Sequence, residues 1–69
     1  MKNMNIENKF TYHAPKFGQP EKYGKIRNMA KEFAYLLDTE CPESTEKTLA
    51  MVKLDEIVFW ANASIARNE

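Results

Sequence analysis

The sequence has 69 residues, ten Lys and Arg against ten Asp and Glu, and 43% apolar residues, which is the size of one small globular domain. It has no apolar run near the length of a membrane span and no secretory signal, so we expect a soluble cytosolic protein. Cys41 has no partner for a disulfide, and with His13 it supplies too few ligands for a structural zinc. We therefore expect neither a disulfide nor a metal in the fold.

The charges are divided unevenly between the two halves. Residues 1–31 carry seven basic and two acidic side chains, a charge of +5, whereas residues 32–69 carry three and eight, a charge of −5. The overall charge of zero argues against a general binder of DNA or RNA, which carries an excess of Lys and Arg. Two interpretations stay open: the halves attract each other, within the fold or between subunits, or the N-terminal half holds an anion.

The N-terminal half predicts an arm followed by a helix. Residues 1–19 contain Pro15 and Gly18 without apolar periodicity, which is typical of an extended arm or loop. Pro20 suits the first turn of a helix, and we expect that helix over about 21–39. Apolar residues recur in it at spacings of three and four, as on one face of an amphipathic helix. These residues are Tyr23, Ile26, Ala30, Phe33 and Leu37.

The C-terminal half predicts a second long helix. Pro42 disfavours helical angles in the residue before it, and Ser44 suits an N-cap, so we expect this helix over about 44–66. Two long helices with a short connection form an antiparallel hairpin. The expected fold is therefore all-α, a single helical-hairpin domain over residues 1–69 with an N-terminal arm.

The apolar residues of the second helix fall on two separate faces when projected at 100° per residue. One face is formed by Met51, Leu54, Ile57, Val58, Ala61 and Ile65, and the other by Val52, Phe59, Ala63 and Ala66. The first helix can cover only one of them, and an apolar helix face requires cover. We therefore expect an obligate homo-oligomer, with Trp60 as a core or interface anchor.

Residue types favour binding over catalysis. His13 is the sole histidine and has no identifiable nucleophile, and Asp55 and Glu56 point about 100° apart on a helix. The basic half also carries Phe10, Tyr12 and Phe17, and aromatic rings with cations suit a ligand that has flat bases and phosphates. Composition alone favours a plainer alternative, in which the aromatics fasten the arm and the lysines are solvated.

Three stretches of sequence resemble a known family. These are FTYHAPKFGQPEKY, the continuation GKIR, and CPESTEKTLAMVKLDEIVFWANASIARNE. Together they are similar to the phage anti-CBASS protein two family, and to the helical-hairpin domain shared with the phage anti-Thoeris protein one. The resemblance covers roughly residues 8–69. It implies a phage-encoded hexamer in the cytoplasm of the infected bacterium that sequesters cyclic oligonucleotides of the host's CBASS defence without degrading them.

The resemblance also implies two kinds of ligand site between subunits. For cyclic dinucleotides such as 3',3'-cyclic GMP-AMP it implies Tyr12 for stacking, Lys25 or Arg27 for a phosphate or base, and His13 as a weaker candidate. For cyclic trinucleotides such as cyclic tri-adenylate it implies Arg67, with Asn68 beside it in the last turn. Neither a metal, a cofactor, a nucleic-acid polymer nor a membrane is implied.

The chain departs from the family pattern at Thr45, where an arginine is common, and this puts the trinucleotide site in question. Two alternatives to a nucleotide-sequestering protein stay open. One is a helical interaction module that binds a host protein through the basic half, and the other is an enzyme that degrades the signal.

Overall fold

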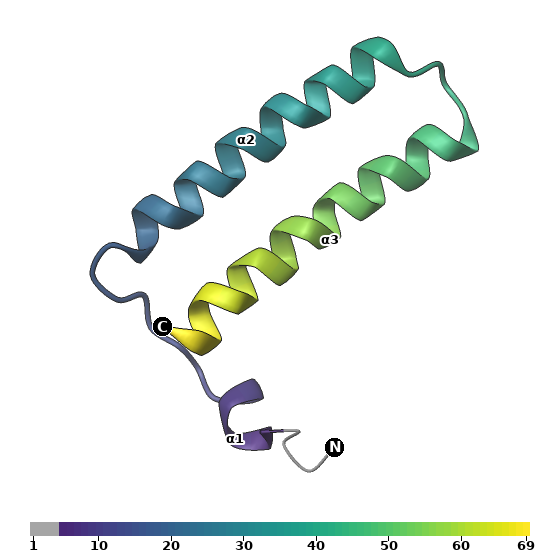
Figure 1. Ribbon diagram of the computed structural model, residues 1–69. Helices are drawn as coiled ribbons and strands as arrows, with labels where there is room; N and C mark the ends of the chain where they lie inside the picture. Colours follow the sequence, from purple (N-terminus) through teal and green to yellow (C-terminus); the bar gives the residue numbers. More distant parts are fainter. Residues whose placement is uncertain (1–4) are drawn as a thin grey trace.

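A computed structural model describes residues 5–69 of the chain. Within that range it contains three helices and no strand: α1 (Ile6–Lys9), α2 (Gln19–Glu40) and α3 (Thr45–Asn68). Helices α2 and α3 run antiparallel and side by side, as Figure 1 shows, and the arm passes the end of α3. The predicted all-α class and the packing of two long helices are confirmed. No helix among the described residues is both long enough and apolar enough to cross a membrane.

Helix α2 begins two residues before the predicted start. Gly18 precedes it with a φ of 84°, a left-handed conformation that glycine adopts without steric cost. The Gln19 amide donates to the Lys16 carbonyl at 3.0 Å, and the Lys16 amide donates to Gln19 Oε1 at 2.9 Å. These reciprocal bonds bring Gln19 into the first turn, where Pro20 follows. At the other end, Cys41 is extended before Pro42 and α2 stops.

The hairpin turn is held by a helix cap and a lysine. Ser44 Oγ accepts a hydrogen bond from the Lys47 amide at 3.1 Å, which confirms Ser44 as the N-cap of α3. Lys47 Nζ lies 2.5 Å from Glu43 Oε1 and 2.9 Å from Asp38 Oδ1. The hydrogen bonds to Glu43 and then Asp38 raise the pKa of Lys47 above its usual value. Lys47 thus ties the end of α2 to the start of α3.

The two long helices pack along one apolar face of α3. Among the described residues, Leu54 is the one apolar residue that is buried, with 9% of its surface exposed. Met51 and Val58 lie half-buried on the same face. On the second face, Phe59 is 65% exposed and Val52 is also exposed. The second face is therefore uncovered at Phe59 and Val52, as predicted, but Ala63 and Ala66 on that face are half-buried. On the first face, Ile57 is 59% exposed. Trp60 is 66% exposed, so within the chain it is not a core residue.

The prediction of a wholly irregular arm is wrong at Ile6–Lys9, which form the short helix α1. Asn5 caps this helix in a left-handed conformation, with φ 54°, and its side chain accepts from the Asn8 amide at 3.4 Å. Asparagine tolerates this conformation better than most residues because its polar side chain can hydrogen-bond locally. A helix of four residues leaves no apolar periodicity in the sequence, which is why the pattern did not predict it.

The chain is extended for its length. Its radius of gyration is 15.2 Å, with principal extents of 43 × 30 × 15 Å, whereas a compact domain of this length has a radius of about 11 Å. Its accessible surface is 5889 Å², against about 4,450 Å² for a typical folded monomer of 8.0 kDa. The hairpin by itself leaves an unusually large share of its surface uncovered.

Candidate ligand-binding site

The arm is fastened to the end of α3 at the open end of the hairpin. Asn8 Nδ2 donates to the Arg67 carbonyl oxygen at 3.0 Å. His13 Nε2 lies 2.7 Å from the Asn8 carbonyl oxygen, and because a carbonyl only accepts, this nitrogen is the protonated one. These bonds bring residues 8–13 back against a helix that ends more than fifty residues later in the chain.

A hollow of about 420 Å³ lies between the arm and α3. Tyr12 is 84% exposed at its edge, and His13 and Arg67 are half-buried in its wall. Asn62 also lines it, and Asn62 Oδ1 is a buried oxygen without a hydrogen-bond partner among the described residues. The complete lining is Lys9, Thr11, Tyr12, His13, Tyr23, Asn62, Ala63, Ala66 and Arg67. The hollow thus combines aromatic rings, cations and hydrogen-bonding groups.

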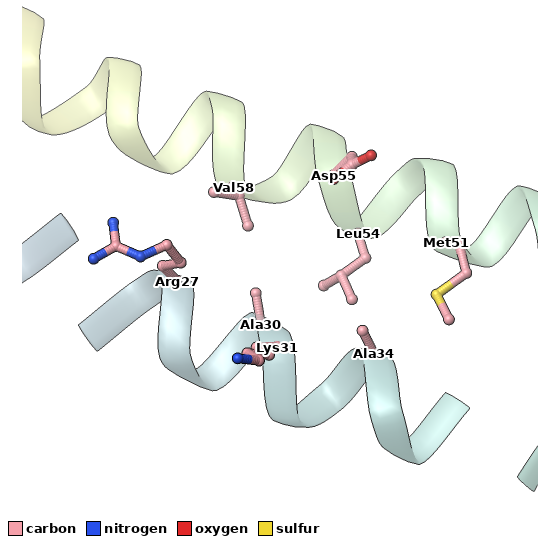
Figure 2. A pocket seen from close by; sticks show the side chains of 8 residues that line it. All are labelled: Arg27, Ala30, Lys31, Ala34, Met51, Leu54, Asp55 and Val58. Carbon is pink, nitrogen blue, oxygen red and sulfur yellow. The ribbon is translucent and has the colours of Figure 1, made fainter. Parts of the chain in front are cut away.

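A second hollow of about 410 Å³ lies between the middle parts of α2 and α3, and Figure 2 shows its side chains. Arg27 and Lys31 stand on the α2 side and Asp55 on the α3 side. The floor between them is apolar, formed by Ala30, Ala34, Met51, Leu54 and Val58. Two cations beside an apolar floor can hold a phosphate and cover the face of a base.

Lys25 lies in a third hollow, a more apolar groove of about 600 Å³. Arg27 is absent from its lining, because residues two apart on a helix point about 200° away from each other. The groove is lined by Lys25, Ile26, Met29, Ala30, Phe33, Leu54, Ile57, Val58 and Ala61. Its apolar floor suits a flat hydrophobic surface.

The structure brings together only some of the residues that the sequence singled out. Tyr12, His13 and Arg67 line one hollow, whereas Lys25 and Arg27 belong to two others. Arg67 also borders a hollow with Trp60, Phe59, Glu56 and Ala63 on the outer side of α3. The Asn68 side chain donates to the Ser64 carbonyl oxygen at 3.0 Å, inside its own helix.

Sequence reasoning did not nominate Lys9, Tyr23 and Asn62 as site residues, although they share the hollow with Tyr12. Tyr23 belongs to the apolar spacing predicted for the first helix, and Asn62 carries no signal of its own in the sequence. No spacing in the sequence connects these residues, because the connection is made by the arm folding back on α3. Within residues 5–69, no cluster of three or more His, Cys, Asp or Glu side chains is arranged to hold a metal ion.

Comparison with known protein families gives a match over nearly the whole chain. Residues 2–66 match the family described as Acb2/Tad1, hairpin domain. The chain belongs to the Acb2/Tad1 hairpin-domain family. This confirms the resemblance read from the sequence, and membership of the Acb2/Tad1 family fits a phage anti-defence protein. Neither a curated protein nor a solved structure matches the chain.

Proposed function

We propose that this member of the Acb2/Tad1 family binds and sequesters cyclic di- and trinucleotides, such as 3',3'-cyclic GMP-AMP and cyclic tri-adenylate. By holding these messengers in the cytoplasm of the infected bacterium, it blocks CBASS signalling for the phage. The observation that carries the proposal is the hollow at the open end of the hairpin, which an exposed tyrosine ring of the arm and Arg67 of α3 both line. Family membership supports the same role.

The chemistry of the hollows suits such a ligand. Stacking of a base on an aromatic ring contributes about 1–3 kcal/mol, and a charge-assisted hydrogen bond to phosphate contributes about 1.5–3 kcal/mol. A dissociation constant near 1 nM requires about −12 kcal/mol. Two stacked bases and several phosphate contacts reach that range when the pocket is formed before the ligand arrives, since little ordering then opposes binding.

The proposed dinucleotide site takes residues from more than one copy of the chain. Tyr12 and Arg27 line different hollows of one hairpin, and we place the dinucleotide where a second hairpin adds its own ring and cation to them. A cyclic dinucleotide has two bases and two phosphates, and a two-fold axis between copies supplies each ring and each cation twice. The accessible surface of 5889 Å² exceeds that of a typical monomer by roughly 1,400 Å². This excess is larger than the ~800 Å² that each partner buries in a standard interface. We therefore include a homo-oligomer, a hexamer, in the proposal.

Binding without degradation is part of the proposal. His13 Nε2 donates to the Asn8 carbonyl oxygen, which leaves Nδ1 as the basic nitrogen of the ring. A general base also needs an oriented nucleophile or water whose proton lies within hydrogen-bond distance, and no hydroxyl or thiol of the described residues donates to His13. The groups around His13 are better suited to recognising a ligand than to breaking a phosphodiester bond.

A second candidate function is the binding of a host protein. The apolar groove beside Lys25 favours it, because an exposed apolar groove between helices can accept an amphipathic helix. This function predicts a tightly bound polypeptide and no bound nucleotide.

Isothermal titration calorimetry with cyclic GMP-AMP and cyclic tri-adenylate tests the proposal. We expect binding of both, loss of the dinucleotide in Tyr12→Ala and loss of the trinucleotide in Arg67→Ala. Tyr12→Phe is the matched control, because it keeps the ring and should keep dinucleotide binding. Absence of heat with folded protein at micromolar concentration would reject the function. Loss of both ligands in each alanine variant would reject the separation of the two sites.

A further inference from the structure

Glu69 is the meeting point, through its side chain and its backbone oxygen, of several polar groups from the N-terminal half of the chain. Lys22 Nζ of α2 forms an ion pair with a Glu69 carboxylate oxygen, and Gln19 Nε2 lies 3.4 Å from the other one. Lys16 Nζ of the arm donates to the Glu69 backbone oxygen. Three residues of the basic half therefore converge on Glu69, the C-cap of α3.

Gln19 makes this meeting point specific, because it is buried and fully used. Its side chain is 2% exposed, and Oε1 accepts from the Lys16 amide while Nε2 faces Glu69 and the Ile65 carbonyl oxygen. A buried amide without partners is costly, so its hydrogen bonds fix the local geometry. One side chain thus links the end of the arm, the start of α2 and the end of α3.

The arm is consequently held on both sides of the candidate ligand residues. Asn8 fastens it before Tyr12 and His13, through the Arg67 carbonyl oxygen. Lys16 and Gln19 fasten it after them, through Glu69. Tyr12 itself is 84% exposed and has no side-chain hydrogen bond among the described residues. Its position therefore depends on how the arm is held, by the bonds of Thr11 and His13 to the Glu7 and Asn8 carbonyl oxygens and by the attachments on either side.

The charges around Glu69 agree with this arrangement. The hydrogen bond from Lys22 is the main cause that lowers the pKa of Glu69, and Gln19 and Lys16 act in the same direction. Glu69 is also the one acidic residue after Glu56 in the sequence. No neighbouring carboxylate in the described part of α3 can therefore take its place near Lys22.

We propose that Glu69 is a positioning residue for the ligand site: its contacts with Lys22 and Gln19 of α2 and with Lys16 of the arm hold the arm at the end of α3, where Tyr12 and Arg67 line the same hollow. This inference rests on the proposed function, because it assigns Glu69 a part in presenting the nucleotide-binding ring. Glu69 acts through the arm and does not itself contact the ligand.

The test compares Glu69→Gln with Glu69→Lys combined with Lys22→Glu, which reverses the ion pair. Glu32→Gln is the matched control, because Glu32 is an exposed glutamate of α2 with no ion pair among the described residues. Three properties are measured on the full chain: the melting temperature, the NMR signal of the His13 ring, and the affinity for cyclic GMP-AMP by calorimetry.

We expect Glu69→Gln to shift the His13 signal toward its value in an unstructured peptide and to weaken cyclic GMP-AMP binding about threefold to tenfold, which is a large effect for one partly exposed ion pair. The reversed pair restores the ion pair with position 22 but not the bond from Gln19 Nε2, because a lysine side chain cannot accept a hydrogen bond. The His13 signal and the affinity should therefore recover in part. A purely structural role for Glu69 would lower the melting temperature of Glu69→Gln but leave the His13 signal and the affinity of the folded protein unchanged.

The outcomes separate this inference from the proposed function. If Glu69→Gln binds cyclic GMP-AMP with the affinity of the wild type, the inference alone is overturned, whether or not the His13 signal moves. Affinity that stays low in the reversed pair overturns it as well. If the wild-type protein does not bind cyclic GMP-AMP, and its His13 signal is unaltered when cyclic GMP-AMP is added, the proposed function is overturned. The role of Glu69 in the ligand site is then overturned with it.

Discussion

Replacement of Phe59 by alanine measures whether another copy of the chain covers the second face of α3. Full burial of a phenylalanine side chain stabilises a protein by about 1.5–3 kcal/mol, and Phe59 is 65% exposed in the hairpin. The hairpin alone therefore gains only about 0.5–1 kcal/mol from it, which corresponds to a fall in melting temperature below about 8 °C. If Phe59 is instead buried between copies, its replacement costs about 3–5 kcal/mol, and the melting temperature falls by more than about 12 °C.

Thermal unfolding followed by circular dichroism separates the two cases. Leu54→Ala is the reference, since Leu54 is buried within the hairpin and its replacement should cost about 2–5 kcal/mol whether or not the chain associates. We expect Phe59→Ala to match Leu54→Ala, and the melting temperature of the wild type to rise with protein concentration. A small effect of Phe59→Ala together with a concentration-independent melting temperature would refute the reasoning.

Four further predictions concern the turn and the ends of the helices. Ser44→Ala should destabilise the protein by about 0.5–2 kcal/mol in urea unfolding through loss of the N-cap of α3, whereas Ser44→Asp should keep most of the stability. Gly18→Ala should cost about 1–3 kcal/mol in the same assay, because φ is 84° there; equal stability of this variant would contradict the assigned turn. Because the pKa of Lys47 is raised, its contribution to stability is complete below pH 10.5, the ordinary lysine pKa, and is lost as pH rises through the higher folded pKa. Unfolding midpoints measured across that pH range should therefore fall less in Lys47→Met than in the wild type. The lowered pKa of Glu69 has the opposite effect: its contribution to stability is complete above pH 4.5 and is lost as pH falls through the lower folded pKa. If the stability of the wild type and of Glu69→Gln falls equally with acid, the result counts against the ion pair with Lys22.

The hairpin was predictable from the sequence because its determinants are local. Apolar spacing along each helix, Ser44 at the N-cap and Pro42 in the turn lie within a few residues of the features they specify. The start of α2 was placed two residues late because Gln19 joins the helix through its hydrogen bonds with Lys16. Helix α1 was missed because four residues are too few to produce periodicity.

The candidate site was predictable only in its residue types. An aromatic arm and a set of cations can be read from the sequence, but the bond between Asn8 and Arg67 joins residues 59 positions apart. No local pattern reports such a contact. The separation of Lys25 from Arg27 follows from helix geometry alone, whereas the hollow that each one enters depends on how α3 packs against α2.

The two-faced character of α3 links fold and function. One face packs on α2 around Leu54, and the other presents Phe59 to the surroundings, with Trp60 also exposed beside it. Arg67 lies where the outer hollow of α3 meets the hollow beneath the arm. A copy that covers the outer face would thus bring its own groups close to Arg67, which is how a small hairpin can build a large ligand site.

Recovery of the bound molecule tests the central claim most directly. The protein is purified from cells that make cyclic GMP-AMP, denatured by heat, and its supernatant is separated by chromatography. We predict release of intact cyclic dinucleotide in stoichiometric amount from the wild type and its loss in Tyr12→Ala. Linear products would indicate an enzyme, and a bound polypeptide without nucleotide would indicate a protein-binding module; either result would contradict sequestration of cyclic nucleotides.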